Sequence, residues 1–255
     1  MKKAIVAITC LLFFSLNFTT NAHAHFSENY YETKTTLEEA PNAFSHAIFD
    51  KLLKKYVNAT GNVNYAGFKR DKAKLKNYLN LLQKANPNKL SRKEQIAFWI
   101  NAYNAHTIYL VIQKYPITSI LKINGGKVWT TKKLNIGGRK SITLSKIEKT
   151  ILIGKYKEPR IHFAINCAAK SCPPLMNKAW TGARLNADLK KMTQKFINNK
   201  KFNSISSKKA NLSKIFEWYK KDFGNVATFI NKYSASKISR NTKITYAEYN
   251  WNLNK

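Results

Sequence analysis

The side chains best suited to catalysis lie in one short segment, where His162 is followed by Cys167 and Cys172. A thiolate is a strong nucleophile, and an imidazole can take up and return its proton. Lys170 lies between the two cysteines, where its charge would favour a thiolate. The segment therefore suggests a thiol-dependent enzyme for acyl transfer or hydrolysis, in which a cysteine attacks a carbonyl group and His162 acts as acid and base.

The same two cysteines allow two other interpretations. In an oxidising compartment, a pair this close in sequence could form a structural disulfide worth roughly 2 kcal/mol. A reversible dithiol would instead indicate a thiol–disulfide redox protein, although the Cys-x-x-x-x-Cys spacing differs from the Cys-x-x-Cys of thioredoxin-like motifs. The sequence leaves open whether Cys167 and Cys172 are a disulfide or free.

Two asparagines, Asn101 and Asn104, lie one helical turn apart in the apolar segment Ile96–His106. A buried amide without a partner costs roughly 1 to 3 kcal/mol, so both side chains need hydrogen bonds. Either they tie neighbouring loops to the segment, or they orient a substrate, a histidine or an oxyanion. The candidate catalytic residues are therefore Cys167, His162, Asn101, Asn104 and Cys172.

Cofactor and metal chemistry lack their usual sequence patterns. The chain contains no G-x-G-x-x-G, no phosphate-binding P-loop and no G-x-S-x-G motif. Two cysteines with one nearby histidine fit no standard zinc spacing. We therefore expect no cofactor and no metal. The aromatic side chains Phe216, Trp218, Tyr219 and Trp251 are expected to belong to the core.

The asparagines need a long buried helix to position them. Ser91 and Glu94 have the spacing of a capping box, which predicts the start of a helix. The sequence that follows is apolar on nearly every face, as in a central helix, and Tyr115-Pro116 ends it. We predict a buried central helix over about residues 91–113.

The remaining elements are expected to surround this helix. A second capping box, Ser145 and Glu148, predicts the start of a short helix, and the pair Gly137-Gly138 predicts a hairpin turn. Hydrophobic spacing predicts helices at about 44–57, 71–83, 145–153, 185–199, 215–222 and 225–232, an extended piece at 62–65, a hairpin at 128–144, and strands at 160–166 and 243–251. Because helices and strands mix without a regular βαβ rhythm, the fold class is α+β, in a single domain with several peripheral helices and mixed short strands.

The first residues have the features of a secretory signal peptide. Lys2 and Lys3 precede an apolar stretch from Ala4 to about Leu16, and Ala22-His23-Ala24 is a small-x-small cleavage site. The apolar stretch is shorter than the roughly 20 residues that span a bilayer. We expect a signal peptide at 1–24 with cleavage after Ala24, a flexible arm at 25–41, a single domain at 42–255, and an exported protein of the periplasm or the medium without a transmembrane span.

The chain is strongly basic, with 45 Lys and Arg against 13 Asp and Glu and a formal net charge of +32. Such a field concentrates polyanions near the surface, so an anionic envelope polymer or lipid headgroups are candidate partners. The lysines are scattered rather than clustered, and nucleic acid is not an expected partner. An alternative function is therefore a non-enzymatic envelope binding protein with a structural Cys167–Cys172 disulfide and a basic surface for an anionic glycan or lipid.

Several of these segments together resemble one family. They are Phe98-Trp99-Ile100-Asn101-Ala102-Tyr103-Asn104-Ala105, Tyr115-Pro116, Ile147-Glu148, Pro159-Arg160-Ile161-His162-Phe163-Ala164, Cys167, Ser171-Cys172-Pro173-Pro174-Leu175, Ser213-Lys214-Ile215-Phe216 and Trp218-Tyr219. In this order, from about residue 44 to the C-terminus, the chain resembles the family called domain of unknown function 547. Asn250 stands in Tyr249-Asn250-Trp251 where the family usually has an aspartate. The resemblance implies that the His162 segment, the two cysteines and the asparagine helix meet in space, and it implies no particular activity.

Overall fold

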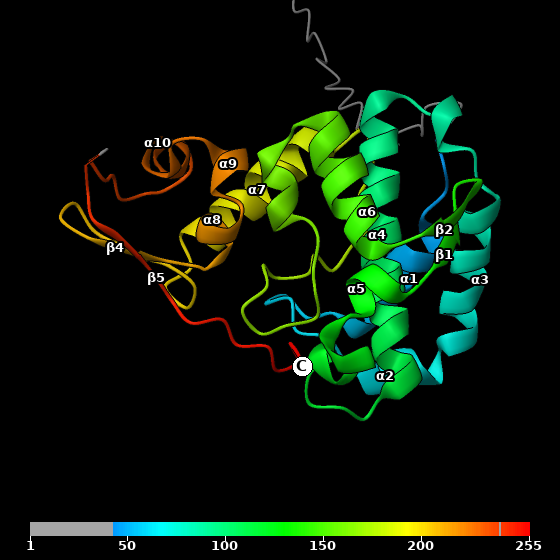
Figure 1. Ribbon diagram of the computed structural model, residues 1–255. Helices are drawn as coiled ribbons and strands as arrows, with labels where there is room; N and C mark the ends of the chain where they lie inside the picture. The colour runs from blue at the N-terminus through cyan, green and yellow to red at the C-terminus, as the bar shows by residue number, and fades with distance from the viewer. Residues whose placement is uncertain (1–42, 240) are drawn as a thin grey trace, which may run out of the picture. The chain divides into compact units, whose positions relative to one another are not determined.

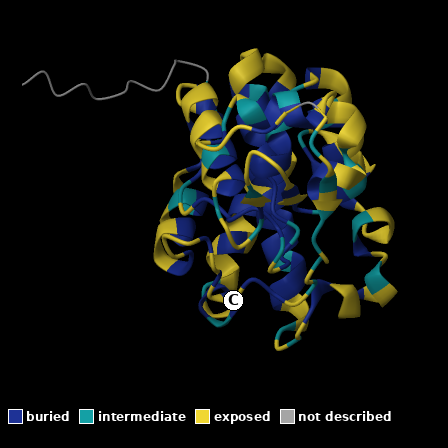
Figure 2. Ribbon diagram, turned by 90° about the vertical axis from the view of Figure 1, so that its left-hand side faces the viewer, coloured by how far each residue is buried: buried dark blue, intermediate teal, exposed yellow. Residues whose placement is uncertain are grey.

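The centre of the fold is the long helix α4 (Arg92–Lys114), in a computed structural model that describes residues 43–239 and 241–255. It begins as predicted, because the Ser91 hydroxyl oxygen accepts a hydrogen bond from the backbone N–H of Glu94 at 3.3 Å. It ends before Tyr115-Pro116. Most of its side chains are buried, which explains why apolar residues occur on nearly every face. Figure 2 shows the buried residues gathered inside and the exposed ones on the outer surface.

The described elements follow one another mostly as short helices (Figure 1). The α-helices besides α4 are α1 (Ala47–Tyr56), α2 (Tyr65–Arg70), α3 (Lys72–Lys84), α5 (Val128–Thr131), α6 (Leu144–Lys146), α7 (Leu185–Ile197), α8 (Ile215–Trp218), α9 (Lys220–Phe223) and α10 (Val226–Asn231). A π-helix, η4 (Ile147–Lys155), continues α6. The 3₁₀ turns are η1 (Pro87–Lys89), η2 (Ile120–Lys122), η3 (Asn124–Gly126) and η5 (Pro159–Phe163).

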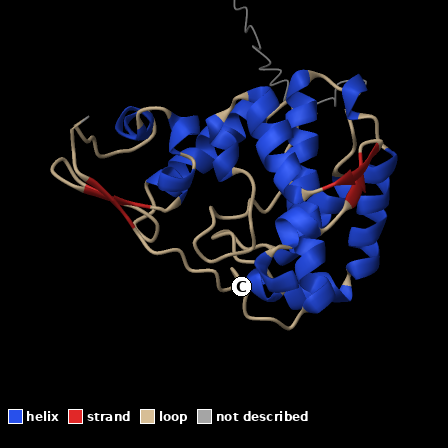
Figure 3. Ribbon diagram, in the orientation of Figure 1, coloured by secondary structure: helices blue, strands red, loops and turns tan. Residues whose placement is uncertain are grey.

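The strands are few and short (Figure 3). Strands β1 (Leu134–Ile136) and β2 (Arg139–Ile142) form the predicted hairpin, in which Gly137 and Gly138 have φ angles of 59° and 73°. Glycine suits this turn because both positions need a positive φ. A second sheet is made by β3 (Ser204–Ile205), β4 (Ala210–Leu212) and β5 (Ile244–Tyr246), with β4 and β5 parallel.

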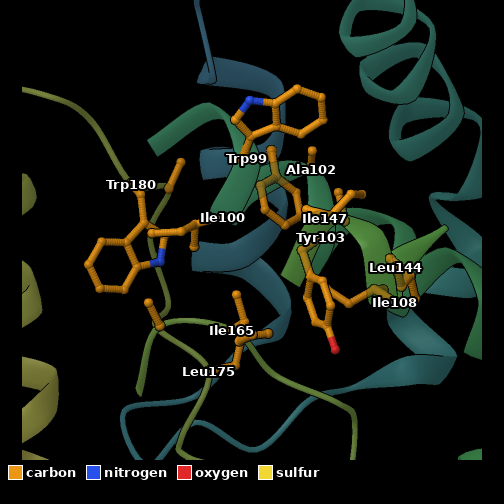
Figure 4. Close-up of a cluster of buried hydrophobic side chains, with 14 of the residues drawn as sticks. Trp99, Ile100, Ala102, Tyr103, Ile108, Leu144, Ile147, Ile165, Leu175 and Trp180 are labelled. Carbon is orange, nitrogen blue, oxygen red and sulfur yellow. The ribbon is translucent and has the colours of Figure 1, made fainter. Parts of the chain in front are cut away.

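Two hydrophobic clusters fill the interior. The larger cluster surrounds α4, and Figure 4 shows Trp99, Ile100 and Tyr103 of this helix packed with Ile147 and Trp180. The smaller cluster is rich in phenylalanines from the C-terminal third of the chain, with Phe163 packed 5.3 Å from Phe196 between ring centroids. The described residues form one compact unit of helices and small sheets, so the predicted α+β single domain is confirmed.

The strand predicted at 160–166 is wrong. Residues Pro159–Phe163 form the 3₁₀ turn η5, and an irregular segment follows. Pro159 has a ring-fixed φ that suits a helical start, and the Glu158 carboxylate accepts from the Arg160 N–H at 3.0 Å. The apolar run is buried by helices instead of by neighbouring strands, and a short apolar run does not by itself distinguish these two environments.

The capping box predicted at Ser145 is also wrong. Thr143 is the capping residue, because its hydroxyl oxygen accepts from the Lys146 N–H at 3.2 Å. The Glu148 side chain instead enters the interior. The hairpin is shorter than predicted, since residues 128–131 form the helical turn α5.

Two further differences concern the helix α2 and the final strand. The helix α2 was not predicted, and Asn64 begins it by accepting from the Gly67 N–H at 2.8 Å. The final strand is shorter than 243–251, because β5 ends at Tyr246 and the chain continues as an irregular strap.

The predictions for residues 1–24 and 25–41 lie outside the described residues. None of the helices that the structure describes is both long enough and apolar enough to span a bilayer.

Candidate functional site

A pocket with a volume of about 220 Å³ lies where the two hydrophobic clusters approach one another. Its walls come from α4, α5, the start of η4, the segment from His162 to Pro173, α8 and the C-terminal strap. The lining residues are Tyr103, Trp129, Thr130, Ser145, Glu148, Lys149, His162, Ile165, Cys167, Cys172, Pro173, Ile215, Trp218, Tyr219, Tyr249 and Trp251. Three sequence-predicted residues, His162, Cys167 and Cys172, are therefore brought together.

Glu148 supplies a buried carboxyl group to this pocket, with 8 % of its surface exposed. Its Oε1 accepts from the Tyr219 hydroxyl at 2.5 Å, and its Oε2 accepts from the Tyr103 hydroxyl at 3.3 Å. Burial raises the pKa of Glu148 above its ordinary value, although the two tyrosine hydrogen bonds act in the opposite direction. Asp222 adds a negative charge that raises the pKa further. Such a carboxyl group can hold a proton at a pH where an exposed one has lost it.

His162 is 3 % exposed, and its Nε2 lies 2.8 Å from Oδ2 of Asp222, in α9. Burial lowers the pKa of His162, while Asp222 opposes this effect. A carboxylate only accepts, so Nε2 carries the proton of the neutral ring and Nδ1 keeps the lone pair. The ring packs against that of Tyr219, with 4.0 Å between centroids. Tyr219 therefore contacts both Glu148 and His162.

Cys167 and Cys172 form a disulfide. The Tyr249 hydroxyl lies 3.1 Å from Cys167 Sγ, and it must be the donor because a disulfide sulfur carries no proton. The Cys167 N–H donates to Cys172 Sγ at 2.8 Å. Neither sulfur is a thiolate in this structure, which therefore matches the structural-disulfide alternative. A thiol nucleophile would require reduction of this disulfide.

The C-terminal strap, residues 247–255, holds the disulfide loop in place. The Lys170 N–H donates to the Asn252 carbonyl at 2.7 Å, and the Asn250 N–H donates to the Ser171 hydroxyl oxygen at 2.9 Å. The strap also carries Tyr249 and Trp251 into the pocket wall. The Asn250 side chain accepts from the Asn252 N–H at 2.9 Å.

Asn101 and Asn104 lie outside the described lining of the pocket and tie loops to α4. The Asn101 amide donates to the Trp180 carbonyl at 2.8 Å and accepts from the Trp180 N–H at 3.0 Å. The Asn104 amide donates to the Ala164 carbonyl at 3.0 Å and accepts from the Asn166 N–H at 2.8 Å. These contacts match the loop-tying alternative. Asn104 acts on the site indirectly, because it fixes the backbone that leads into Cys167.

The prediction that the late aromatic side chains are all core is wrong for Trp218 and incomplete for Tyr219 and Trp251, which pack against the core clusters and also face the pocket. Phe216 is fully buried, but Trp218, Tyr219 and Trp251 line the pocket. Trp218 is 46 % exposed. Helical spacing alone places Trp218 and Phe216 on the same short helix and does not separate a pocket wall from a core.

The structure adds residues to the candidate site that the sequence does not predict as catalytic. These are Glu148, Asp222, Tyr103, Tyr219 and Tyr249. The sequence predicts a helix-capping role for Glu148, and Asp222 is 60 positions from His162 in sequence. Within the described residues, no group of three or more His, Cys, Asp or Glu side chains is arranged to hold a metal ion.

The arrangement provides a proton donor and a proton acceptor in one partly apolar pocket. A buried carboxyl group with a raised pKa and a histidine with a lowered pKa are typical of acid–base sites. The aromatic walls can exclude water from a bound substrate.

Comparison with known proteins finds one family model that matches part of the chain and no individual relative. Residues 87–197 match the family model described as "Protein of unknown function, DUF547". A search of curated proteins and a search of solved structures each found no match. The family match is shorter than the expected range from about residue 44 to the C-terminus. It includes Glu148, His162 and both cysteines and ends before Tyr219, Asp222 and the strap. Over residues 87–197, therefore, the chain is similar to the DUF547 family.

Proposed function

We propose that this protein is a hydrolase that cleaves an ester, amide or glycosidic bond by acid–base catalysis in the pocket. The observation that carries the proposal is the placement of Glu148, a buried carboxyl group with a raised pKa, beside the His162–Asp222 pair. Tyr219 connects the two groups, since its hydroxyl donates to Glu148 and its ring packs on His162. Burial favours the protonated form of Glu148 and the neutral form of His162, because it raises the pKa of the first and lowers the pKa of the second. The two groups are therefore suited to opposite roles in proton transfer.

In this proposal Glu148 is the general acid and His162 the general base. A water molecule attacks the substrate carbon and gives a proton to His162, whose ring is oriented by Asp222. The bond to the leaving oxygen or nitrogen breaks with its electron pair, and the leaving atom takes the proton of Glu148. Transfer of the proton from His162 back to Glu148 through water restores the site.

A thiol-dependent route is the second candidate, favoured by the presence of Cys167 and His162 in the same pocket. It requires a dithiol reductant to open the Cys167–Cys172 disulfide. Cys167 would then attack the carbonyl carbon, with its proton passing to His162 and the proton of Glu148 passing to the leaving group. Water would release the acyl group from sulfur. This route differs from the first in its need for reduction.

The experiment is a turnover assay with p-nitrophenyl esters, p-nitroanilides and p-nitrophenyl glycosides, on the oxidised protein and after dithiothreitol treatment. In the oxidised protein, E148Q and H162Q should each lower kcat by about 10² to 10⁴. E248Q, which changes an exposed carboxyl group, is the control and should keep wild-type turnover.

Each outcome separates the candidates. Turnover that appears only after reduction and disappears in C167A assigns the thiol-dependent route. Turnover that persists in both E148Q and H162Q, or the absence of turnover with every substrate class, would overturn the enzymatic proposal. The remaining function would then be a non-enzymatic envelope binding protein with a structural disulfide.

We also propose that the chain is exported and that residues 1–24 are removed. The Cys167–Cys172 disulfide supports this, because disulfides persist in oxidising compartments. N-terminal sequencing of the protein from the producing cell should begin at His25. A mature protein that begins at Met1 in the cytosol would contradict the proposal.

A further inference from the structure

Four aromatic side chains form a continuous surface at the pocket, here called the aromatic platform: Trp129, Trp218, Tyr249 and Trp251. The Trp218 ring lies 4.8 Å from Tyr249 and 6.0 Å from Trp251 between centroids. The Tyr249 and Trp251 rings are 4.6 Å apart, and Trp129 lies 5.9 Å from Trp251. The platform therefore joins α5, α8 and the strap.

The platform is partly exposed, although aromatic rings are among the side chains that gain most from burial. Trp218 is 46 % exposed, and it is one of few large apolar side chains with so much exposed surface among the described residues. An exposed apolar patch beside polar groups is typical of a binding surface.

The geometry favours a ligand that lies on one face of the rings. Trp218 and Trp251 are nearly parallel, at 26°, but their centroids are 6.0 Å apart, so they already contact one another. A planar base stacked between two rings would need roughly twice the 3.4 Å stacking distance. A sugar ring fits better, because its C–H face can rest on the platform while its hydroxyl groups turn towards a polar wall.

The polar wall and the charge narrow the class of sugar. Thr130, Ser145 and Glu148 line the same pocket and can exchange hydrogen bonds with hydroxyl groups. Lys149 lines it too, and the exposed side chains of Lys127, Lys132, Lys220 and Lys221 flank α5 and α8. Glu217, beside Trp218, is paired with Lys214 at 2.8 Å. An anionic saccharide is complementary to these lysines and to the net charge of +32.

We propose that the aromatic platform binds a sugar ring of an acidic oligosaccharide, with the ring face on Trp218 and the hydroxyl edge towards Glu148. The proposal rests on the proposed function to the extent that it names the substrate class of the same pocket. The bond to be cleaved would then lie in the glycan or in a group attached to it.

The test uses isothermal titration of the full-length protein with a galacturonic acid tetramer, a galactose tetramer and a thymidine oligonucleotide. The acidic tetramer should bind, and W218A should weaken its affinity by about tenfold or more, while W218F should restore most of it. L81A is the matched control, because Leu81 is also exposed, at 45 %, and lies in α3 away from the pocket lining. The galactose tetramer should bind more weakly, and added salt should reduce the difference.

Two results would overturn the proposal. One is that neither tetramer binds, or that W218A binds the acidic tetramer as tightly as L81A does. The other is that the oligonucleotide binds more tightly than the acidic tetramer, which would indicate a site for stacked bases.

Binding by E148Q distinguishes this inference from the enzymatic proposal. If E148Q and the wild type bind the acidic tetramer and neither turns over any substrate, the glycan site stands and the enzyme proposal fails. If an assay shows turnover that depends on Glu148 but the tetramer does not bind, the enzyme proposal stands and the glycan inference fails.

Discussion

Glu148 is held in the interior by the hydroxyl groups of Tyr103 and Tyr219, although an ionised carboxylate prefers water. Glu148 lies in the first turn of the π-helix η4, a rare geometry that occurs often at functional sites. The burial and hydrogen bonds of this side chain set its pKa, and its proposed role as an acid depends on that pKa. The titration of Glu148 can be measured without a substrate.

Replacement of Glu148 by glutamine should change how stability depends on pH. Because burial raises the folded pKa above the ordinary value of 4.5, the folded protein keeps a proton that the unfolded chain releases. This contribution to stability is complete below pH 4.5 and is lost as the pH rises through the raised value. Urea unfolding from pH 4 to pH 8 should therefore show a smaller loss of stability in E148Q than in the wild type.

The control for this measurement is E248Q, which alters an exposed carboxyl group next to the platform. Its pH profile should run parallel to that of the wild type. A profile for E148Q that also runs parallel to the wild type would mean that Glu148 titrates as an ordinary carboxyl group, and it would remove the basis for its role as an acid.

Asn101 provides a second residue-scale prediction. N101A leaves the buried N–H and carbonyl of Trp180 without their side-chain partners. The unfolding free energy should fall by about 2 to 4 kcal/mol, as measured by urea denaturation. N80A, on the exposed side of α3, is the control and should change stability by no more than about 0.5 kcal/mol. An effect of N101A as small as that of N80A would show that Asn101 does not tie the loop to α4.

At the scale of elements, the strap connects the pocket to the rest of the fold. Asn254 is 6 % exposed, its Oδ1 accepts from the Tyr65 hydroxyl at 2.6 Å, and its Nδ2 donates to Asn166 Oδ1 at 3.2 Å. Asn166 in turn accepts from the Ala168 N–H at 2.8 Å within the disulfide loop. The end of the chain therefore holds the loop that presents Cys167.

N254A should lower the unfolding free energy by about 2 kcal/mol, because two buried polar groups lose a partner. N252A is a matched control in the same strap, since the Asn252 side chain is exposed and its structural contacts come from the backbone. Thermal unfolding of both variants measures the difference. Equal melting temperatures would indicate that the strap is not anchored through Asn254.

The sequence predicted those elements that carry local signals. The Ser91 cap and the Tyr115-Pro116 end located α4, and the glycine pair located the hairpin turn, because caps and turns depend on residues that are neighbours in sequence. The strand predicted at 160–166 is wrong because a short apolar run is compatible both with a strand and with a buried 3₁₀ turn. Only packing decided between them.

At the scale of the whole molecule, burial of histidines links stability to pH. Burial lowers the pKa of His46 to about 3 and of His106 to about 4, against an ordinary value of 6.5. Below pH 6.5 the unfolded chain takes up protons on both residues while the folded protein does not, so stability falls as the pH falls.

The double variant H46Q/H106Q should remove this part of the pH dependence. Between pH 7 and pH 5 the wild type should lose about 4 kcal/mol more than the variant, because each histidine contributes about 2 kcal/mol at pH 5. Urea unfolding at the two pH values measures the difference. The opposite sign, a larger loss in the variant, would show that the two histidines are protonated in the folded protein.

The sequence by itself determined the fold class, the central helix and the segment containing His162, Cys167 and Cys172. These features follow from composition, hydrophobic period and caps, which act over a few neighbouring residues. Only the tertiary structure decided that the cysteines pair, that Asn101 and Asn104 tie loops to the helix, and that Glu148 and Asp222 accompany His162. Hydrogen bonds between residues 60 or more positions apart depend on how the helices pack, and no local pattern in the chain records that packing.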